Sequence, residues 1–443
     1  MTKHRDAFTV SRSDFPEGFL FATATSAYQI EGHQFGGAGP THWDSFARQP
    51  GKVYKGQTGA LACDHYHRWE GDLDLIRDAG LDAYRFSTSW ARVMPDGKTL
   101  NPEGMDFYDR LVDGMLERGI KPMATLYHWE LPQALADKGG WTSREIPQRF
   151  ADYSHKIAAR LGDRLWSTAP VNEPWCVAWL SHYEGYHAPG LADLRSAARA
   201  MHHVALAHGL SVEALRDEGV QNVGAACNME YALPATDRDA DVEAAQLYDG
   251  IYNRWFVGAM MKGAYPEDVL EGLSPHMPEG WQDDMALISQ PLDWMGINYY
   301  TCKRMIRSKG DWPAYGTVDG PLPKTDMGWE ICPEGFDWLL RRTAEEYTGD
   351  LPLYVTENGM ANAEPADLSD HARIDYIDRH LEMARDMVRD GVPLRGYTIW
   401  SLLDNYEWTL GYDKRFGLVH IDFDSLDRTP KASYHALARA LER

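Results

Sequence analysis

The sequence has few of the features that mark disulfide-stabilised, secreted or membrane proteins. Its 443 residues include only five cysteines, and no two of them form a CxxC pair. An odd number of scattered cysteines argues against a disulfide framework and favours a reducing compartment, so we expect a cytoplasmic protein. The first thirty residues contain no apolar segment followed by a cleavage site, which predicts no signal peptide, and no apolar run reaches the length of a membrane span.

Positive charge is also scarce. Lysine and arginine number 44 against 66 aspartates and glutamates, which gives a formal net charge of −22. Such a surface repels nucleic acid and anionic membranes, so we expect neither as a partner. No GxGxxG opens a helix after a strand, no HExxH occurs, and the adjacent His202 and His203 have a poor spacing for metal ligands on a predicted helix. We therefore expect no nucleotide cofactor and no metal.

Aromatic residues, in contrast, are abundant, with 16 tryptophans and 23 tyrosines. A large packed core would account for many of them, because aromatic side chains bury large areas. Flat apolar faces with polar edges also line carbohydrate-binding clefts. Composition alone leaves both interpretations open.

Short apolar or β-rich runs alternate with longer amphipathic stretches along the whole chain. Eight such runs are predicted strands, at residues 19–28, 83–90, 121–129, 166–173, 222–229, 293–301, 351–357 and 394–403. Strands that alternate with helices favour a parallel sheet, and eight repeats of the unit favour an α/β fold of the (β/α)8 barrel type. No linker divides the sequence, so we expect one domain over residues 1–443. Residues 304–324 lack periodicity and predict a long loop after the sixth strand.

Polar and aromatic side chains gather where most of these strands end. In a barrel, the carboxyl ends of the strands and the loops that follow them form the active site. Charged groups in strand interiors need partners, so several polar termini that converge on one barrel mouth describe a polar, aromatic-lined cleft. The residues concerned include Gln29, Arg85, His128, Trp129, Asn172, Asn298, Tyr300, Trp400, Glu407 and Trp408.

Two of these strands end in glutamate, at Glu173 and Glu357. A pair of carboxyl groups about 5–5.5 Å apart suits double displacement at an anomeric carbon, whereas about 6.5–9.5 Å leaves room for a water molecule and implies inversion. A single glutamate at such a position is more often part of an ion pair or a helix cap. The spacing along the chain does not decide between these alternatives.

The motifs of the chain resemble those of a known family, glycoside hydrolase family 1. The resemblance extends nearly from end to end, and its motifs stand in the order of the family: "FLFATATSAYQIEG" from residue 19, "YRFSTSW", "YHWELPQAL", "VNEPW", "GYHAPG", "MGINYYT", "YVTENGM", "WSLLDNYEWTLGYDKRFGLVHID" and "RTPKASY" from residue 428. It implies a (β/α)8 barrel and a retaining β-glycosidase, most closely a β-glucosidase.

The resemblance also implies a role for each site residue. Glu357 would be the nucleophile that forms a glycosyl-enzyme ester, and Glu173 the acid that protonates the leaving oxygen and then activates water. Arg85 and Tyr300 would lie beside the nucleophile, and Asn172 would hold the sugar 2-hydroxyl. The sugar subsite would further include Gln29, His128, Asn298, Trp400, Glu407 and Trp408, with Trp329 at the subsite of the leaving group and Phe416 and Trp129 as apolar wall.

Elementary electrostatics agrees with these implied roles. A cation such as Arg85 lowers the pKa of a neighbouring carboxyl, and so does a phenol donor, which keeps a nucleophile ionised. Burial and the negative charge of Glu357 would raise the pKa of Glu173 and keep its proton near neutral pH. Once the ester forms, that charge disappears, the pKa of Glu173 should fall, and the residue can act as base.

The sequence departs from the family pattern at two positions. Pro170 stands two residues before Asn172, where the family usually has threonine, and a proline in a central strand predicts a local bulge or adjustment because it has no N–H to donate. Glu130 stands where aspartate is common. Neither change removes a group with an implied catalytic role.

Several alternatives stay open from the sequence. Gln29 and Glu407 can serve either epimer at the sugar 4-hydroxyl, so a β-galactosidase or β-fucosidase is the nearest alternative, followed by a sugar-binding pseudoenzyme and a metal-dependent hydrolase. Because Glu407 would repel phosphate, an unphosphorylated carbohydrate is the expected small-molecule substrate. The sequence leaves the leaving group undetermined, and it allows either a monomer or a homo-oligomer.

Overall fold

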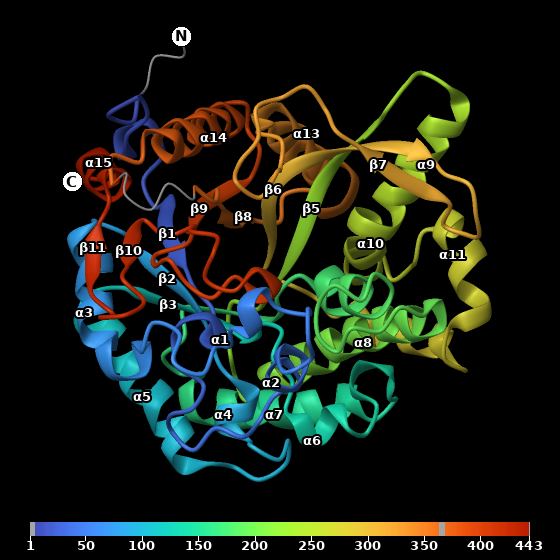
Figure 1. Cartoon of the computed structure of the whole chain (residues 1–443), viewed down its shortest axis with the longest axis horizontal. Coiled ribbons are helices and arrows are strands. Elements are labelled where there is room, and N and C mark those ends of the chain that lie inside the picture. The colour runs from blue at the N-terminus through green and yellow to red at the C-terminus, as the bar shows by residue number, and fades with distance from the viewer. Residues whose placement is uncertain (1–4, 363–367, 443) are drawn as a thin grey trace.

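Eight parallel strands form the centre of the molecule, and helices surround them (Figure 1). The structure is a computed structural model that describes residues 5–362 and 368–442. The central strands are Leu20–Ala24 (β1), Ala83–Ser87 (β2), Lys121–Tyr127 (β3), Ser167–Val171 (β4), Gly224–Pro234 (β5), Trp294–Arg307 (β6), Leu353–Asn358 (β8) and Leu394–Trp400 (β9). All eight fall on predicted strands, which confirms the predicted (β/α)8 arrangement.

The strands lie side by side in chain order. Neighbouring strands pair in the order β4-β3-β2-β1-β9-β8-β6-β5. Two isolated parallel bridges, Thr168 with Val223 and Asn172 with Ala226, join β4 to β5 and close the ring. The strands are buried on both faces, as expected for a parallel sheet covered by helices.

Pro170 lies at the point where the ring closes. The two bridges are four residues apart on β4 and three residues apart on β5, so β4 carries one extra residue there. On its other edge β4 keeps an unbroken register with β3. The missing N–H of Pro170 therefore falls in a local bulge against β5, as the sequence predicted.

Helices follow the strands and cover the outside of the ring. The longer ones are His65–Asp78 (α3), Pro102–Glu117 (α5), Ile146–Leu161 (α7), Leu194–Asp217 (α8), Asp239–Asp249 (α9), Trp255–Lys262 (α10), Pro333–Thr343 (α13), His371–Arg389 (α14) and Ala432–Ala440 (α15). Short helices are Ala27–Ile30 (α1), His42–Ala47 (α2), Trp90–Val93 (α4), Gln133–Ala136 (α6), Glu267–Leu273 (α11) and Met285–Ile288 (α12). None of the described helices is long and apolar enough to cross a membrane.

Local sequence signals explain several helix ends. Asp193 accepts a hydrogen bond from the backbone N–H of Ser196 at 2.8 Å and so caps α8. Pro102 and Pro333 occupy the first turns of α5 and α13, where a missing N–H costs nothing. The faces that these helices turn inward are apolar and join one large buried cluster around the strands.

Two predictions about segment boundaries are wrong. The loop predicted over residues 304–324 contains the end of β6 and a further strand, Tyr315–Val318 (β7), which pairs antiparallel with β6 (Figure 1). Its side chains are half-buried or exposed on both faces, so no alternating hydrophobic pattern marks it. The first predicted strand is too long, because β1 ends at Ala24 and α1 begins at Ala27, inside the predicted range. A small pair, Val419–Ile421 (β10) and Arg428–Pro430 (β11), lies outside the barrel.

Candidate active site

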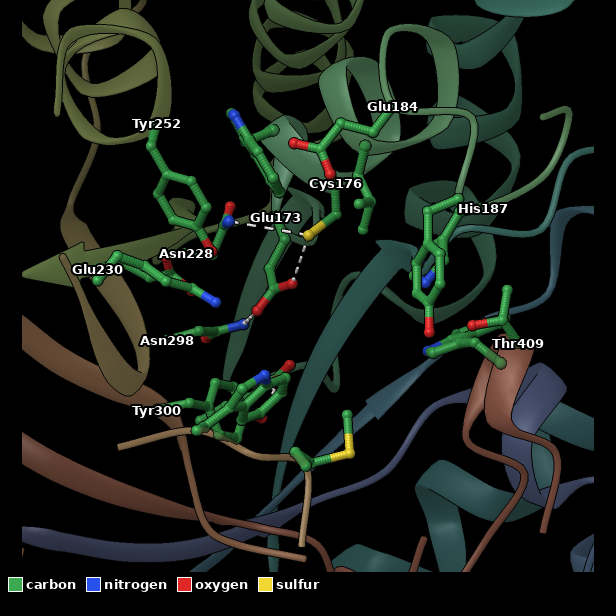
Figure 2. A pocket seen from close by; sticks show the side chains of 18 of the residues that line it. Glu173, Cys176, Glu184, His187, Asn228, Glu230, Tyr252, Asn298, Tyr300 and Thr409 are labelled. Atoms are coloured by element: carbon green, nitrogen blue, oxygen red, sulfur yellow. Dashed lines mark hydrogen bonds between the residues drawn. The ribbon is translucent and has the colours of Figure 1, made fainter. Parts of the chain in front are cut away.

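A cavity of about 770 Å³ opens at the carboxyl ends of the strands. All but three of the site residues predicted from the sequence line it: His128, Trp129, Glu173, Asn298, Tyr300, Trp329, Glu357, Trp400, Glu407, Trp408 and Phe416. The three that do not line it are Gln29, Asn172 and Arg85. Figure 2 shows part of the cavity, with Glu173 at its centre, Tyr252 and Asn298 to one side and His187 to the other.

Glu357 lies near the end of β8 and is held by two donors. Arg85 of β2 donates to its Oε1 at 2.5 Å, and the hydroxyl of Tyr300 donates to its Oε2 at 2.7 Å. Gly359 follows at a point of close approach, because a Cβ there would lie 1.8 Å from the carbonyl oxygen of Trp400. The lack of a side chain at this position lets the segment after Glu357 pass against the end of β9.

Glu173 lies just beyond β4, with a positive φ of 48° that turns the chain out of the strand. The side-chain amide of Asn298 donates to its Oε1 at 2.8 Å. The thiol of Cys176 donates to its Oε2 at 3.2 Å, and the amide of Asn228 donates in turn to the sulfur at 3.7 Å (Figure 2). The carboxyl group of Glu173 is thus fixed from both sides.

A buried network of amides links the two glutamates. Asn298 also donates to Oδ1 of Asn172 at 3.0 Å, and Arg85 donates to the same oxygen at 2.7 Å. Arg85 therefore contacts both Asn172 and Glu357, and Asn298 contacts both Asn172 and Glu173. All five side chains are at most 5% exposed, so few alternative geometries are available to them.

The environment separates the protonation of the two carboxyl groups. Burial, followed by the charge of Glu357, raises the pKa of Glu173 to about 8. Burial also raises the pKa of Glu357, but Arg85 and the hydroxyl of Tyr300 oppose that rise. The carboxyl group beside the guanidinium ionises first, so near neutral pH Glu357 is the charged partner and Glu173 holds the proton.

Several buried polar atoms of the side chains that line the cavity have no hydrogen-bond partner among the described residues. They include Nδ1 of His128 and Oε2 of Glu407. Burial, followed by the charge of Arg85, lowers the pKa of His128 well below its usual value, so the ring is neutral. Burial, then Glu357 and Glu173, raises the pKa of Glu407 to about 8. Because an unsatisfied buried polar atom is costly, these two atoms await a ligand with hydroxyl groups.

Aromatic rings form the walls of this part of the cavity. The ring of His128 stacks on Trp400 at a centroid distance of 5.5 Å and on Trp408 at 6.1 Å. Trp329 lies 5.5 Å from Tyr300 and 6.2 Å from Phe416, and these rings pack in one cluster with Trp400. Flat apolar faces next to unpaired polar atoms suit a molecule with apolar faces and a hydroxylated rim.

Gln29 and Glu130 lie behind the wall. The amide of Gln29 donates to Asn405 at 2.9 Å and to the carbonyl of Tyr406 at 2.8 Å, while Ser26 donates to its oxygen at 2.6 Å. The amide nitrogen of Gln29 therefore holds the segment that precedes Glu407, and its oxygen is engaged by Ser26. Glu130 is 1% exposed, and burial raises its pKa well above the usual value.

Some residues at the site were not identified from the sequence. Cys176 follows Glu173 by three residues at the start of a helical segment, and this spacing alone could have indicated the contact. Thr356 precedes Glu357 on β8 and donates to Oδ1 of Asn298 at 2.6 Å. No pattern in the sequence indicated this contact. Glu184, Glu230 and Lys303 also line the cavity, from segments whose paths beyond the barrel are not legible in the sequence.

The described parts of the chain, residues 5–362 and 368–442, contain no group of three or more His, Cys, Asp or Glu side chains arranged to hold a metal ion. The chemistry available at the cavity is that of two carboxyl groups in different protonation states. One is poised to attack as an anion and the other to give up a proton. Paired carboxyl groups of this kind carry out glycoside hydrolysis.

Comparison with known proteins also indicates glycoside hydrolysis. The family model "Glycosyl hydrolase family 1" matches residues 11–442. A β-glucosidase of Agrobacterium sp. is 46% identical over 440 residues, which cover 96% of this chain and 95% of that protein. A bifunctional β-D-glucosidase/β-D-fucosidase of Bifidobacterium breve is 43% identical over 95% of this chain and 96% of its own length.

Solved structures are equally similar. The family 1 β-glucosidase from Thermotoga maritima in complex with isofagomine lactam superposes with a TM-score of 0.93 at 42% sequence identity. The match covers 98% of this chain and 99% of that one. Sequence and three-dimensional structure therefore agree over almost the full length of both proteins.

Proposed function

Since the chain belongs to glycosyl hydrolase family 1, and is therefore a glycoside hydrolase, we propose that it is a retaining β-glucosidase in which Glu357 and Glu173 carry out the chemistry. The resemblance seen in the sequence motifs is confirmed at the level of the family. Its substrates are terminal, non-reducing β-D-glucosyl residues of glucosides or short oligosaccharides. The observation that supports the proposal most is the pair of buried carboxyl groups with opposite protonation, held in one hydrogen-bonded network.

In the first step Glu357 attacks the anomeric carbon while the bond from that carbon to the leaving oxygen breaks. Glu173 transfers its proton to that oxygen, and the leaving group departs as a neutral alcohol. The product on the enzyme is a glycosyl ester of Glu357. Arg85 and Tyr300 keep the nucleophile ionised. The family resemblance assigns to Asn172 the bond to the sugar 2-hydroxyl, where hydrogen bonds strengthen in the transition state.

In the second step the roles of Glu173 are reversed. Having given its proton to the leaving oxygen, Glu173 is a carboxylate. With Glu357 esterified, the charge that raised the pKa of Glu173 is gone, so Glu173 stays ionised until it accepts a proton from water. The oxygen of that water attacks the anomeric carbon, the ester bond breaks, and Glu357 is released as a carboxylate. Two inversions at one carbon give net retention, and Glu173 again holds a proton.

The sugar is recognised by polar atoms of His128 and Glu407 that have no partner among the described residues of the cavity. Glu407 offers an acceptor to hydroxyl groups, and the Nδ1–H of His128, whose Nε2 accepts from Asn172, offers a donor. The indole faces of Trp400 and Trp408 cover the sugar ring. Gln29 acts from behind by holding the carbonyl of Tyr406 next to Glu407. Asn298 supports both glutamates, whereas Trp129, Trp329 and Phe416 supply apolar wall.

A β-fucosidase or β-galactosidase activity is the second candidate, and one observation favours it. A relative that is 43% identical is named a bifunctional β-D-glucosidase/β-D-fucosidase. The two oxygens of a carboxyl group such as that of Glu407 accept hydroxyl hydrogens in more than one direction, so Glu407 tolerates either configuration at the sugar 4-position. We therefore expect measurable fucosidase activity beside the glucosidase activity.

We further propose that residues 1–443 form one catalytic domain that works in the cytoplasm. The match of one family model to residues 11–442 supports the first point. The five cysteines, all free and buried, support the second because a reducing compartment keeps thiols unpaired.

Initial rates on a panel of 4-nitrophenyl glycosides test the proposed function. The panel contains the β-glucoside, β-galactoside, β-fucoside and α-glucoside, and we expect the β-glucoside to give the highest kcat/KM and the α-glucoside none. The variants Glu357→Ala and Glu173→Gln serve as controls on the same panel. Full activity of Glu357→Ala on the β-glucoside, or preferred turnover of the α-glucoside, would overturn the proposal.

A further inference from the structure

Two cysteine side chains that are thirty residues apart in the chain lie together outside the catalytic cavity. Cys302 belongs to β6, and Cys332 immediately precedes α13. Helix α13 packs beside β5 and β6 (Figure 1). The two residues are only 3% and 5% exposed, and neither of them lines the cavity that contains Glu173 and Glu357. The catalytic chemistry therefore makes no use of this pair.

Hydrogen bonds hold the segment before α13 against β6. The hydroxyl of Tyr299 donates to the carbonyl of Cys332 at 2.6 Å, and the hydroxyl of Thr301 donates to the carbonyl of Glu330 at 3.0 Å. The first turn of α13 comes equally close, because a Cβ on Gly335 would lie 2.6 Å from the hydroxyl of Tyr299. The main chain around Cys332 is therefore fixed next to β6.

Tyr231 of β5 lies beside both cysteines. It pairs with Cys302 in the register of β5 and β6. A Cβ on Gly335, three residues after Cys332, would lie 2.8 Å from the Cβ of Tyr231. Burial, followed by Cys332 and Cys302, raises the pKa of the Tyr231 phenol. The two thiols thus lie near the same ring, and they form a hydrogen bond with each other.

The two thiols differ in how easily they ionise. Cys302 can donate to Oε2 of Glu330 at 3.5 Å, and its hydrogen bond with Cys332, followed by burial, raises the pKa of Cys302. Cys332 stands at the N-cap of α13. The hydrogen bond from Cys302 and the backbone N–H of Gly335 outweigh its burial and lower the pKa of Cys332 to about 7. Cys332 is therefore the thiolate of the pair, and Cys302 keeps its proton.

A second cavity gives a small oxidant access to the pair. It has a volume of about 370 Å³ and is lined by Cys302, by two carboxyl groups and by the cations Lys303, Arg304 and Lys324. This volume is many times that of a peroxide molecule, since a water molecule takes about 30 Å³ of the liquid. The pair is thus within reach of a peroxide although both side chains are nearly buried.

We propose that Cys302 and Cys332 are a site of reversible oxidation, at which a peroxide converts the two thiols into a disulfide that fixes β6 to the start of α13. In the first step the sulfur of Cys332 attacks one peroxide oxygen, the O–O bond breaks, and the hydroxide that leaves takes up a proton from the solvent. Cys332 is then a sulfenic acid. In the second step the sulfur of Cys302 attacks that of Cys332, the S–O bond breaks, and the hydroxyl group leaves with the proton of Cys302 as water.

The disulfide would close a loop that includes β7 and Trp329. Strand β7 has no buried face of its own, so the closed loop would limit the conformations of a segment that few apolar contacts hold. A disulfide across a loop of this length stabilises a protein mainly by restricting its unfolded chain. Oxidation should therefore make the enzyme more resistant to heat.

Treatment of the reduced full-length protein with hydrogen peroxide tests the proposal. We expect the loss of two of the five thiols, a mass lower by two hydrogens, and one pair of tryptic peptides joined through Cys302 and Cys332. Dithiothreitol should reverse all three changes. The melting temperature of the oxidised protein should rise by about 2–4 °C. Before oxidation, a limiting amount of iodoacetamide should label Cys332 faster than Cys302.

Serine variants separate the roles of the two residues. Cys302→Ser and Cys332→Ser should each abolish the cross-link and the rise in melting temperature. In Cys302→Ser the sulfenic acid of Cys332 has no thiol to react with, so dimedone should capture it there. The matched control is Cys63→Ser, at a buried cysteine whose thiol donates to the carbonyl of Asp404 at 3.2 Å, and this variant should still form the cross-link.

Three results would overturn the proposal. Peroxide could leave all five thiols free, or it could oxidise single cysteines without joining these two; either outcome excludes the disulfide. A cross-link that leaves the melting temperature unchanged would contradict the stabilising role. Circular dichroism of each variant before oxidation verifies that the fold is retained.

Discussion

The affinity of Glu173 for its proton, expressed as the pKa of its carboxyl group, should change during the reaction, and this change can be measured. Burial and then the charge of Glu357 raise the pKa of Glu173 to about 8 in the free enzyme. Esterification of Glu357 removes that charge and leaves the burial and the contacts with Asn298 and Cys176 in place. The pKa of Glu173 should therefore fall when the glycosyl-enzyme forms.

The size of the fall follows from Coulomb's law. Two carboxyl groups of a retaining enzyme are about 5.5 Å apart. At an effective dielectric constant of about 20, one unit charge at that distance contributes about 3 kcal/mol. Since about 1.4 kcal/mol corresponds to one pKa unit, we expect the pKa of Glu173 to drop by about 2. The residue then changes from an acid to a base at neutral pH.

Carbon-13 NMR of protein labelled at the glutamate carboxyl carbons gives the pKa directly. The Glu173→Gln variant, which lacks one resonance, assigns the signal. Titrations are recorded before and after trapping with 2-deoxy-2-fluoro-β-D-glucosyl fluoride, which leaves a stable ester. A Glu173 resonance that titrates at the same pH in both forms would refute the electrostatic coupling.

Three further predictions concern single side chains. Cys176→Ala removes a hydrogen-bond donor to Glu173, so the pKa of Glu173 should rise and the alkaline limb of the kcat/KM profile should move to higher pH. An alkaline limb that stays in place or moves to lower pH contradicts this prediction. Arg92→Met leaves Glu31 buried without its partner at 3.0 Å and should lower the free energy of unfolding by about 3–5 kcal/mol in urea titrations. A decrease in the free energy of unfolding of under about 1 kcal/mol would show that other groups are sufficient to stabilise the buried side chain of Glu31. Glu407→Ala should lower kcat/KM for the aryl β-glucoside by about a hundredfold or more, because it loses the hydrogen bonds between sugar hydroxyls and the buried carboxyl group of Glu407. Unchanged discrimination against 4-deoxy and 6-deoxy glucosides would contradict that role.

The barrel and the catalytic pair were legible in the sequence for a physical reason. Strands buried on both faces produce continuous apolar runs, and a glutamate at the end of such a run, as at Glu173 and Glu357, stands out from its surroundings. The order of the motifs then indicated the family. Even Pro170, which conflicts with a central strand, correctly indicated a bulge.

The outer parts of the site were less predictable because their geometry depends on long-range pairing. Strand β7 is held by main-chain hydrogen bonds to β6 and has no buried face of its own, so its sequence resembles that of a loop. Glu184 and Glu230 reach the cavity only because a helical segment and a bulged strand direct them there. The enclosed position of Gln29 likewise depends on a segment more than 370 residues away.

The stereochemistry of the first-formed product tests the central claim most directly. Proton NMR during the first minutes of hydrolysis of an aryl β-glucoside distinguishes the two anomers before they equilibrate. Attack by Glu357 followed by attack of water predicts the β-anomer of glucose as the initial product, and a mass increase of one trapped sugar on the peptide that contains Glu357. Initial release of the α-anomer, or a label on any other residue, would contradict the account.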